Sequence, residues 1–104
     1  MATITAIKPQ KGTRRRLNIF LDGVFAFSLD PVVVEESGLF PGKELSDIEM
    51  GDLAEKDEGE KAYQAALLLL GFRKRSKKEI QDRLARRGFG SEIMARTVQR
   101  LEDQ

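Results

Sequence analysis

The dipeptide Asp22-Gly23 constrains the fold of this chain more than any other feature of its sequence. Apolar and polar residues alternate on both sides of it, and an Asp-Gly pair between two such segments is typical of a two-residue β-hairpin turn. We therefore predict antiparallel strands over residues 14–21 and 24–29, with a further strand over residues 3–8. Because a two-residue loop fixes the register, the expected cross-strand pairs are Leu21 with Val24, Phe20 with Phe25, Ile19 with Ala26, and Asn18 with Phe27.

The predicted register gives the hairpin two partly apolar faces. Aromatic side chains on one of them could stack nucleic-acid bases, or they could pack in a core. No aromatic residue alternates with Lys or Arg as it does on a surface that binds single strands, so core packing is favoured. One face carries Leu17, Ile19, Leu21, Val24 and Ala26, and the other carries Phe20, Phe25 and Phe27.

Capping signals indicate two helices after the hairpin. Asp30-Pro31 predicts the N-cap and first residue of a short helix over residues 31–37, and Gly38 fits its C-terminal stop. The segment 46–49 (Ser-Asp-Ile-Glu) is a capping box, in which the serine and glutamate side chains satisfy backbone N–H groups that the helix leaves free. It opens a helix that we expect to end near residue 56.

Three more helices are expected after the acidic segment 57–60. The first spans about 58–73, with apolar side chains at helical spacing. A second capping box at 76–79 opens a helix to about Arg87 that stops at Gly88, and the last helix starts at 90–92. Because the links are short, these helices predict a compact three-helix bundle. The apolar stripes are Ala62, Ala65, Ala66, Leu69 and Leu70, then Ile80 and Leu84, then Met94, Val98 and Leu101.

Together these elements predict an α+β fold. It consists of an N-terminal three-stranded antiparallel sheet or hairpin, followed by short helices and a three-helix bundle module. We expect the hairpin region and its short helix in residues 1–45 and a helical region in residues 46–104, with the three-helix module at about 58–103.

Composition excludes several classes of function. The chain has no Cys and no His, which removes disulfides, thiolate metal sites, nucleophilic cysteine and imidazole acid–base chemistry. Its longest apolar run, residues 65–70, has six residues, whereas a membrane span needs ~20. No Ser-His-Asp arrangement, P-loop or glycine-rich phosphate loop is present. We therefore expect a cytoplasmic protein that is not an enzyme, has no cofactor or metal, and contacts no membrane.

Charge is segregated along the chain, although the net charge is only +1. Residues 1–20 carry five Lys or Arg and no acid, residues 21–70 carry three Lys against twelve acids, and residues 71–104 carry ten Lys or Arg against five acids. Such asymmetry indicates contact with an anion or an acidic surface. Attraction between the chain's own zones is the alternative.

The main candidate binding surface lies at the start of the second bundle helix and along it. Arg83 and Arg87 are four residues apart and share a face, with Arg86 near its edge. Lys77 and Lys78 oppose the helix dipole, a cost of about 0.3–1 kcal/mol that favours a partner contact over a solvated face. The candidate binding residues are Arg73, Lys74, Arg75, Lys77, Lys78, Arg83, Arg86 and Arg87, and Arg96 and Arg100 follow on the next helix.

A second basic patch lies at the hairpin base, where Lys8 and Lys11 precede the arginines of residues 14–16. Charges that protect a strand edge from pairing are the favoured explanation of this patch.

Nearly the whole chain resembles the RecX family. Its most specific match is Arg75-Ser76 with Glu79-Ile80, followed by Gly88-Phe89, within a helical module over residues 62–101. The N-terminal part is similar to the β-hairpin extension of some members, with residues 18–23 followed by 25–27. Further matching positions are Arg73, Lys74, Lys77, Lys78, Leu84, Arg87, Ile93, Val98 and Leu101.

The resemblance implies a regulator that binds along the groove of the RecA–DNA filament and modulates, usually inhibits, the recombinase. Family members usually stack three helical modules, so we expect this chain to be the first module and hairpin extension of a longer protein, or a naturally short member. Two other hypotheses remain open. The chain could bind nucleic acid directly through its basic helices without RecA, or its acidic and basic zones could pair between copies.

Overall fold

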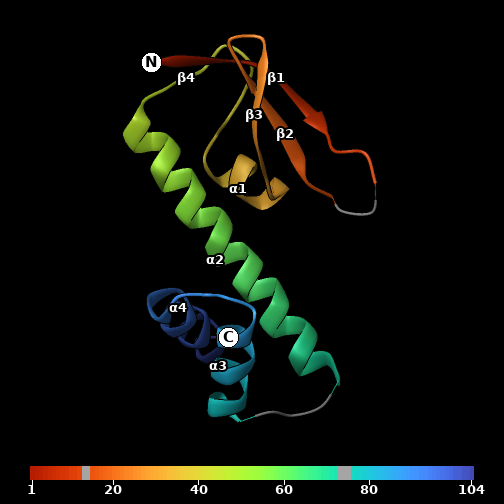
Figure 1. Ribbon diagram of the computed structural model, residues 1–104, viewed down its shortest axis with the longest axis vertical. Coiled ribbons are helices and arrows are strands. Elements are labelled where there is room, and N and C mark those ends of the chain that lie inside the picture. The colour runs from red at the N-terminus through yellow and green to blue at the C-terminus, as the bar shows by residue number, and fades with distance from the viewer. Residues whose placement is uncertain (13–14, 73–75) are drawn as a thin grey trace. The chain divides into compact units, whose positions relative to one another are not determined.

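The computed structural model describes residues 1–12, 15–72 and 76–104, which form two compact units. The strand unit is Met1–Asp57 and the helical unit is Glu58–Gln104 (Figure 1). One long helix, α2 (Asp47–Phe72), begins in the first unit and ends in the second. The α+β class predicted from the sequence is confirmed. None of the described helices is long and apolar enough to span a membrane.

The strand unit contains a sheet in which the described residues form four antiparallel strands. They are β1 (Ala2–Pro9), β2 (Leu17–Leu21), β3 (Val24–Leu29) and β4 (Glu44–Leu45), in the order β3-β2-β1-β4. The short strand β4 was not predicted, because two residues are too few to show an alternating pattern. The expected start of β2 at residue 14 is wrong for the described Arg15 and Arg16, since the strand begins at Leu17.

The turn between β2 and β3 is the predicted one, with positive φ at both Asp22 (50°) and Gly23 (84°). The register holds for the first two pairs beyond the turn and then fails. Ile19 pairs with Phe27 and Asn18 with Ser28, so the predicted Ile19–Ala26 and Asn18–Phe27 pairs are wrong. Ala26 is the extra residue of a β-bulge, which turns the following side chains to the opposite faces.

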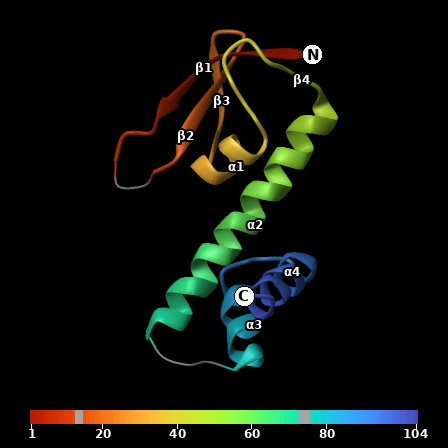
Figure 2. The ribbon, with the colours of Figure 1, turned by 180° about the vertical axis from the view of Figure 1, so that it is seen from behind.

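The bulge places Phe27 against the core. Phe27 joins Leu17 and Leu21 among the partly buried residues that pack on it, whereas the predicted register put it on the other face. Full burial of a phenylalanine side chain contributes roughly 1.5–3 kcal/mol, and Phe27 gains part of this because the small Ala26 takes the irregular position. Helices α1 (Pro31–Glu36) and α2 supply the rest of the core (Figure 2). Its buried residues are Ile4, Ile19, Leu29, Val33, Val34, Leu45 and Leu53.

The predicted caps of this unit are confirmed. Asp30 caps α1 by accepting a hydrogen bond from the Val32 amide at 2.8 Å, and Gly38 follows the helix with φ 62°. Ser46 and Glu49 form the reciprocal capping box of α2, with N–O distances of 3.1 and 3.0 Å. The expected break near residue 57 is wrong, because α2 continues through it. Two of the acidic residues there, Asp57 and Glu60, pair with arginines instead of starting a helix.

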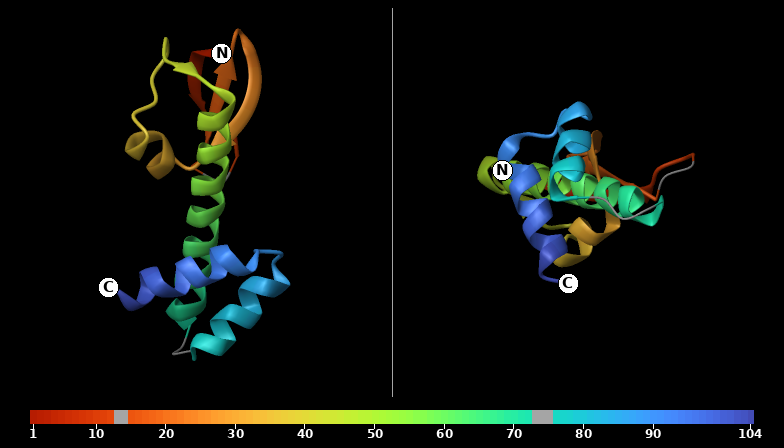
Figure 3. Two further views of the ribbon diagram at one scale, coloured as in Figure 1. Left: turned by 90° about the vertical axis from the view of Figure 1, so that its left-hand side faces the viewer. Right: turned by 90° about the horizontal axis from the view of Figure 1, so that it is seen from below.

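The helical unit packs the later turns of α2 against α3 (Lys77–Arg86) and α4 (Ser91–Glu102) (Figure 3). Ser76 caps α3 as predicted, and Gly88 ends the helix with φ 90°. The Phe89 amide donates to the Leu84 carbonyl at 3.2 Å, as in a Schellman motif. The buried core consists of Ala65, Ala66, Ile80, Leu84 and Val98, with Leu70, Phe89, Met94 and Leu101 packed against it.

The Ser46–Glu49 capping box predicts a defined pH dependence of stability. Hydrogen bonds from the Ser46 amide and hydroxyl lower the pKa of the Glu49 carboxyl from its ordinary value of 4.5. A lowered folded-state pKa stabilises the fold at pH values above the unfolded-state pKa, and this contribution disappears as pH falls through the folded value. We expect Glu49→Gln to lower the urea midpoint at pH 7 and to converge with the wild type in acid below that range. Glu55→Gln, an exposed change on the same helix, is the control; equal effects of both variants at pH 7 would contradict the capping role.

Candidate functional site

Helix α3 holds its basic side chains on a fixed scaffold. Ser76 anchors its first turn by accepting from the Glu79 amide at 3.1 Å, and Ile80 and Leu84 are buried in the core of the helical unit. The charged residues of α3 therefore lie on the sides of the helix that point away from this core. Lys77, Lys78, Arg83, Arg86 and Arg87 are all exposed.

Four of these basic residues form no ion pair with any carboxylate that the structure describes: Lys78, Arg83, Arg86 and Arg87. We call them the α3 cation cluster. Lys77 differs, because its ammonium lies 3.4 Å from Glu102 of α4 in a solvent-exposed pair. The candidates Arg73, Lys74 and Arg75 lie outside the described residues.

The α3 cation cluster is strongly but not purely basic. Residues 77–87 contain five basic and two acidic side chains, and the exposed Asp82 lies four residues from both Lys78 and Arg86. Arg83 and Arg86 also complement the helix dipole in the last turn, whereas Lys78 in the first turn opposes it. Dipole compensation therefore explains only part of the cluster.

Arg100 of α4 has a different role, inside its own unit. Its Nη1 donates to Oε1 of the buried Glu60 at 2.9 Å, and its guanidinium carbon lies 3.5 Å from the centroid of the Tyr63 ring. Gln104 closes the group by donating to the Tyr63 hydroxyl. Arg100 thus holds α4 on α2, and it does not extend the exposed surface of α3. Arg96 pairs with Glu92 one turn away at 2.5 Å.

The second basic patch, at the hairpin base, also contains both a structural arginine and exposed basic residues. Arg16 donates to Oδ2 of the buried Asp57 at 2.8 Å and also to the carbonyl and hydroxyl of Ser28. The other oxygen of Asp57 accepts from the Asp30 amide at 2.8 Å. Arg16 is therefore a structural residue, whereas Lys8, Lys11 and Arg15 are exposed and Arg14 lies outside the described residues. Sequence reasoning missed these pairs, because their partners lie about 40 residues away along the chain.

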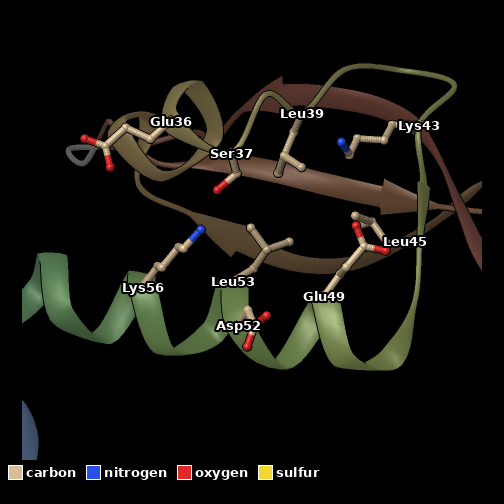
Figure 4. A pocket seen from close by; sticks show the side chains of 9 residues that line it. All are labelled: Glu36, Ser37, Leu39, Lys43, Leu45, Glu49, Asp52, Leu53 and Lys56. Atoms are coloured by element: carbon tan, nitrogen blue, oxygen red, sulfur yellow. The ribbon is translucent and has the colours of Figure 1, made fainter.

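A hollow of about 270 Å³ lies in the strand unit between α2 and the segment after α1. Figure 4 shows Lys56 and Leu53 projecting from α2 toward it, with Lys43 on the far side. Glu49, which lines the hollow, uses its carboxylate to accept a hydrogen bond from the Ser46 amide in the α2 cap. Among the described residues no three carboxylates gather as possible metal ligands. The lining of the hollow is mixed in charge, with Lys43 and Lys56 beside the carboxylates of Glu36, Glu49 and Asp52.

The Arg100 group predicts unequal costs for two arginines of α4. Arg100→Ala removes the cationic partner of the buried Glu60 carboxylate and leaves it, among the described residues, only the longer hydrogen bond from Gln64, at 3.4 Å. We expect a loss of about 1–3 kcal/mol in unfolding free energy. Arg96→Ala removes only an exposed pair within one helix, worth up to ~0.5 kcal/mol. Urea unfolding followed by tyrosine fluorescence measures both, because Tyr63 is the single Tyr and the chain has no Trp. Adding Glu60→Gln to Arg100→Ala should restore part of the loss; equal costs for the two arginines would refute the assignment.

Two models of known protein families match the chain. The model described as RecX, first three-helix domain, matches residues 62–101, and the model described as the regulatory protein RecX N-terminal domain matches residues 2–46. Regulatory protein RecX of Bacillus subtilis (strain 168) is 39% identical over 103 residues, and that of Bacillus cereus (strain G9842) is 36% identical over 105 residues. These alignments cover 99% and 97% of this chain but 39% of each relative.

A solved structure gives the same result. The crystal structure of a regulatory protein RecX aligns with a TM-score of 0.88 and 30% sequence identity, over the whole of this chain and 51% of the other. The chain thus spans about two fifths of the length of the curated relatives that it matches. Both halves of the sequence match the corresponding domains of one family, and the chain belongs to the RecX family of regulatory proteins.

Proposed function

We propose that this chain binds the RecA–DNA filament through the α3 cation cluster and modulates the recombinase, in the inhibitory direction. The observation that carries the proposal is that Lys78, Arg83, Arg86 and Arg87 are exposed without an ion pair among the described residues. The relatives are named regulatory proteins, which supports a role in control.

A nucleoprotein filament suits such a surface for an electrostatic reason. It offers DNA phosphates, and also acidic side chains of the protein. Arginine binds phosphate and carboxylate groups with two parallel hydrogen bonds, and three of the four cluster residues are arginines. Because the buried side chains of Ile80 and Leu84 fix α3 on its core, the helix backbone loses little conformational entropy when a partner binds.

The proposed role requires binding and no chemistry. A module that occupies the filament groove hinders strand exchange and the conformational changes linked to ATP hydrolysis, so the chain acts as a regulator and not as an enzyme. Since RecA filaments form on chromosomal DNA, the proposal also places the chain in the cytoplasm.

Direct nucleic-acid binding is the second candidate function, and the same unpaired cations favour it. The two candidates differ in what they require. Binding to bare DNA by phosphate neutralisation falls steeply with salt and needs no RecA. A filament-dependent module binds the assembled filament far better than either bare DNA or free RecA. Pairing between copies would instead appear as concentration-dependent size in light scattering.

The filament proposal predicts the effect of removing two exposed arginines. We expect Arg83→Gln with Arg87→Gln to weaken binding to preassembled RecA–DNA filaments by about tenfold or more. Each charge-assisted hydrogen bond to a charged partner contributes roughly 1.5–3 kcal/mol, and neighbouring cations replace part of the lost contribution. Binding is measured by fluorescence anisotropy of the labelled chain, and inhibition by RecA ATPase and strand-exchange assays.

A matched control separates position from net charge. Lys56→Gln with Lys61→Gln removes the same charge from α2, and we expect near wild-type filament binding and inhibition. Thermal unfolding checks that both double variants are folded. If the arginine variant binds filaments like the wild type, or if both variants lose affinity equally, the α3 cation cluster is not the contact.

A further inference from the structure

The outer face of the hairpin carries an aromatic pair, in which Phe25 is exposed and Phe20 partly buried, with a cation beside it. The Phe20 and Phe25 rings meet edge to face, with centroids 6.0 Å apart and an interplanar angle of 76°. The Lys8 ammonium lies 5.3 Å from the Phe20 centroid. Phe25 is 52% exposed and Lys8 is also exposed. We call these three residues the outer hairpin face.

Core packing, which the sequence favoured for all three phenylalanines, accounts for only one of them. The bulge at Ala26 sends Phe27 to the inner face, against the core that α1 and α2 complete. Phe20 and Phe25 pair with each other across the strands on the opposite side. Neither ring belongs to the core cluster of the strand unit, and Phe25 remains half exposed to water while Phe20 is partly buried.

The described basic residues of the segments that precede and enter the hairpin are largely unpaired. Lys8, Lys11 and Arg15 are exposed and form no ion pair among the described residues. The first acid of the sequence is Asp22, in the turn, and one of its oxygens accepts from the Thr3 amide at 3.1 Å. A ligand that complements this surface is therefore anionic and also presents a flat, apolar face.

The hairpin tip that carries the rings is held in place by β1. The Thr5 hydroxyl accepts from the Gly23 amide at 3.0 Å and donates to the Phe20 carbonyl at 3.3 Å. Thr5 is itself the extra residue of a bulge in β1, which explains why it is free to reach the turn. The aromatic pair is consequently presented on ordered backbone, which lowers the entropic cost of binding.

We propose that the outer hairpin face binds unpaired bases of a single-stranded nucleic acid. Phe25 stacks on a base, and Lys8 neutralises an adjacent phosphate. Stacking on an aromatic ring requires an unpaired base but no particular sequence. A peptide added to the open edge of β3 would use backbone hydrogen bonds and would need neither the ring pair nor the cations. This surface lies in the other unit from the α3 cation cluster, so the inference does not rest on the filament proposal.

The test uses the chain with no recombinase present. The probe is a fluorescent oligothymidylate of about 12 nucleotides, within the site sizes of single-strand-binding folds. We expect Phe25→Ala to weaken binding at least about fivefold without changing the salt dependence, because it removes stacking and no charge. Phe25→Leu should weaken it too, whereas Val24→Ala, at the neighbouring exposed apolar position, should not.

Charge and base contributions are separated by two further comparisons. Lys8→Gln should reduce the slope of log affinity against log salt by about 0.7, and Lys56→Gln, elsewhere in the unit, by clearly less. An abasic oligonucleotide and a duplex of equal length offer phosphates without accessible bases, so Phe25→Ala should leave their binding unchanged.

Three results would overturn the inference. The first is that the wild type does not bind the single strand. The second is that Phe25→Ala binds it as well as the wild type does. The third is a loss that is not specific to stacking, which would indicate a general apolar or structural effect. Such a loss is seen if Phe25→Ala weakens binding to the abasic probe or the duplex by the same factor, or if Val24→Ala weakens single-strand binding as much as Phe25→Ala does. Circular dichroism confirms that the exposed variants are folded.

Discussion

Two buried carboxylates near the middle of α2 determine which of the described arginines are held inside the fold. Asp57 and Glu60 are 5% and 7% exposed, and an ionised carboxylate at such a depth requires a charged partner or several hydrogen bonds. Each takes an arginine of its own unit: Arg16 for Asp57 and Arg100 for Glu60. These pairs join segments far apart in the sequence, so the acidic middle of the chain acts first as an internal counterion.

The function proposed for the chain depends on what this internal pairing leaves over. The acidic zone neutralises one arginine from each basic end, and Lys77 and Arg96 have exposed carboxylate partners. Among the described residues of the two basic ends, what remains is the α3 cation cluster in the helical unit and Lys8, Lys11 and Arg15 in the strand unit. Internal attraction therefore explains part of the segregated charge, at Arg16 and Arg100. Contact with a partner is our proposal for the basic residues that this pairing leaves exposed.

Local signals predicted most of the secondary structure, and long-range constraints decided the rest. The Asp22-Gly23 turn and the Ser46 and Ser76 caps depend on neighbouring residues alone, and all three formed as expected. The bulge at Ala26 could not be predicted, because it depends on which face of β3 the distant helices cover. The structural roles of Arg16 and Arg100 could not be predicted either, because their carboxylate partners lie about 40 residues away along the chain. Exposure of the α3 basic residues agrees with the sequence, while their contact with a partner stays a prediction.

Lysine footprinting tests the central claim most directly, because it reads accessibility in the wild-type chain without any substitution. The acetylation rate of each lysine is measured by mass spectrometry for the chain alone and in the presence of saturating RecA–DNA filament. We expect strong protection of Lys78 on α3, with Lys56 and Lys61 of α2 reacting at unchanged rates. Acetylation of Lys78 at the same rate with and without bound filament would contradict the account.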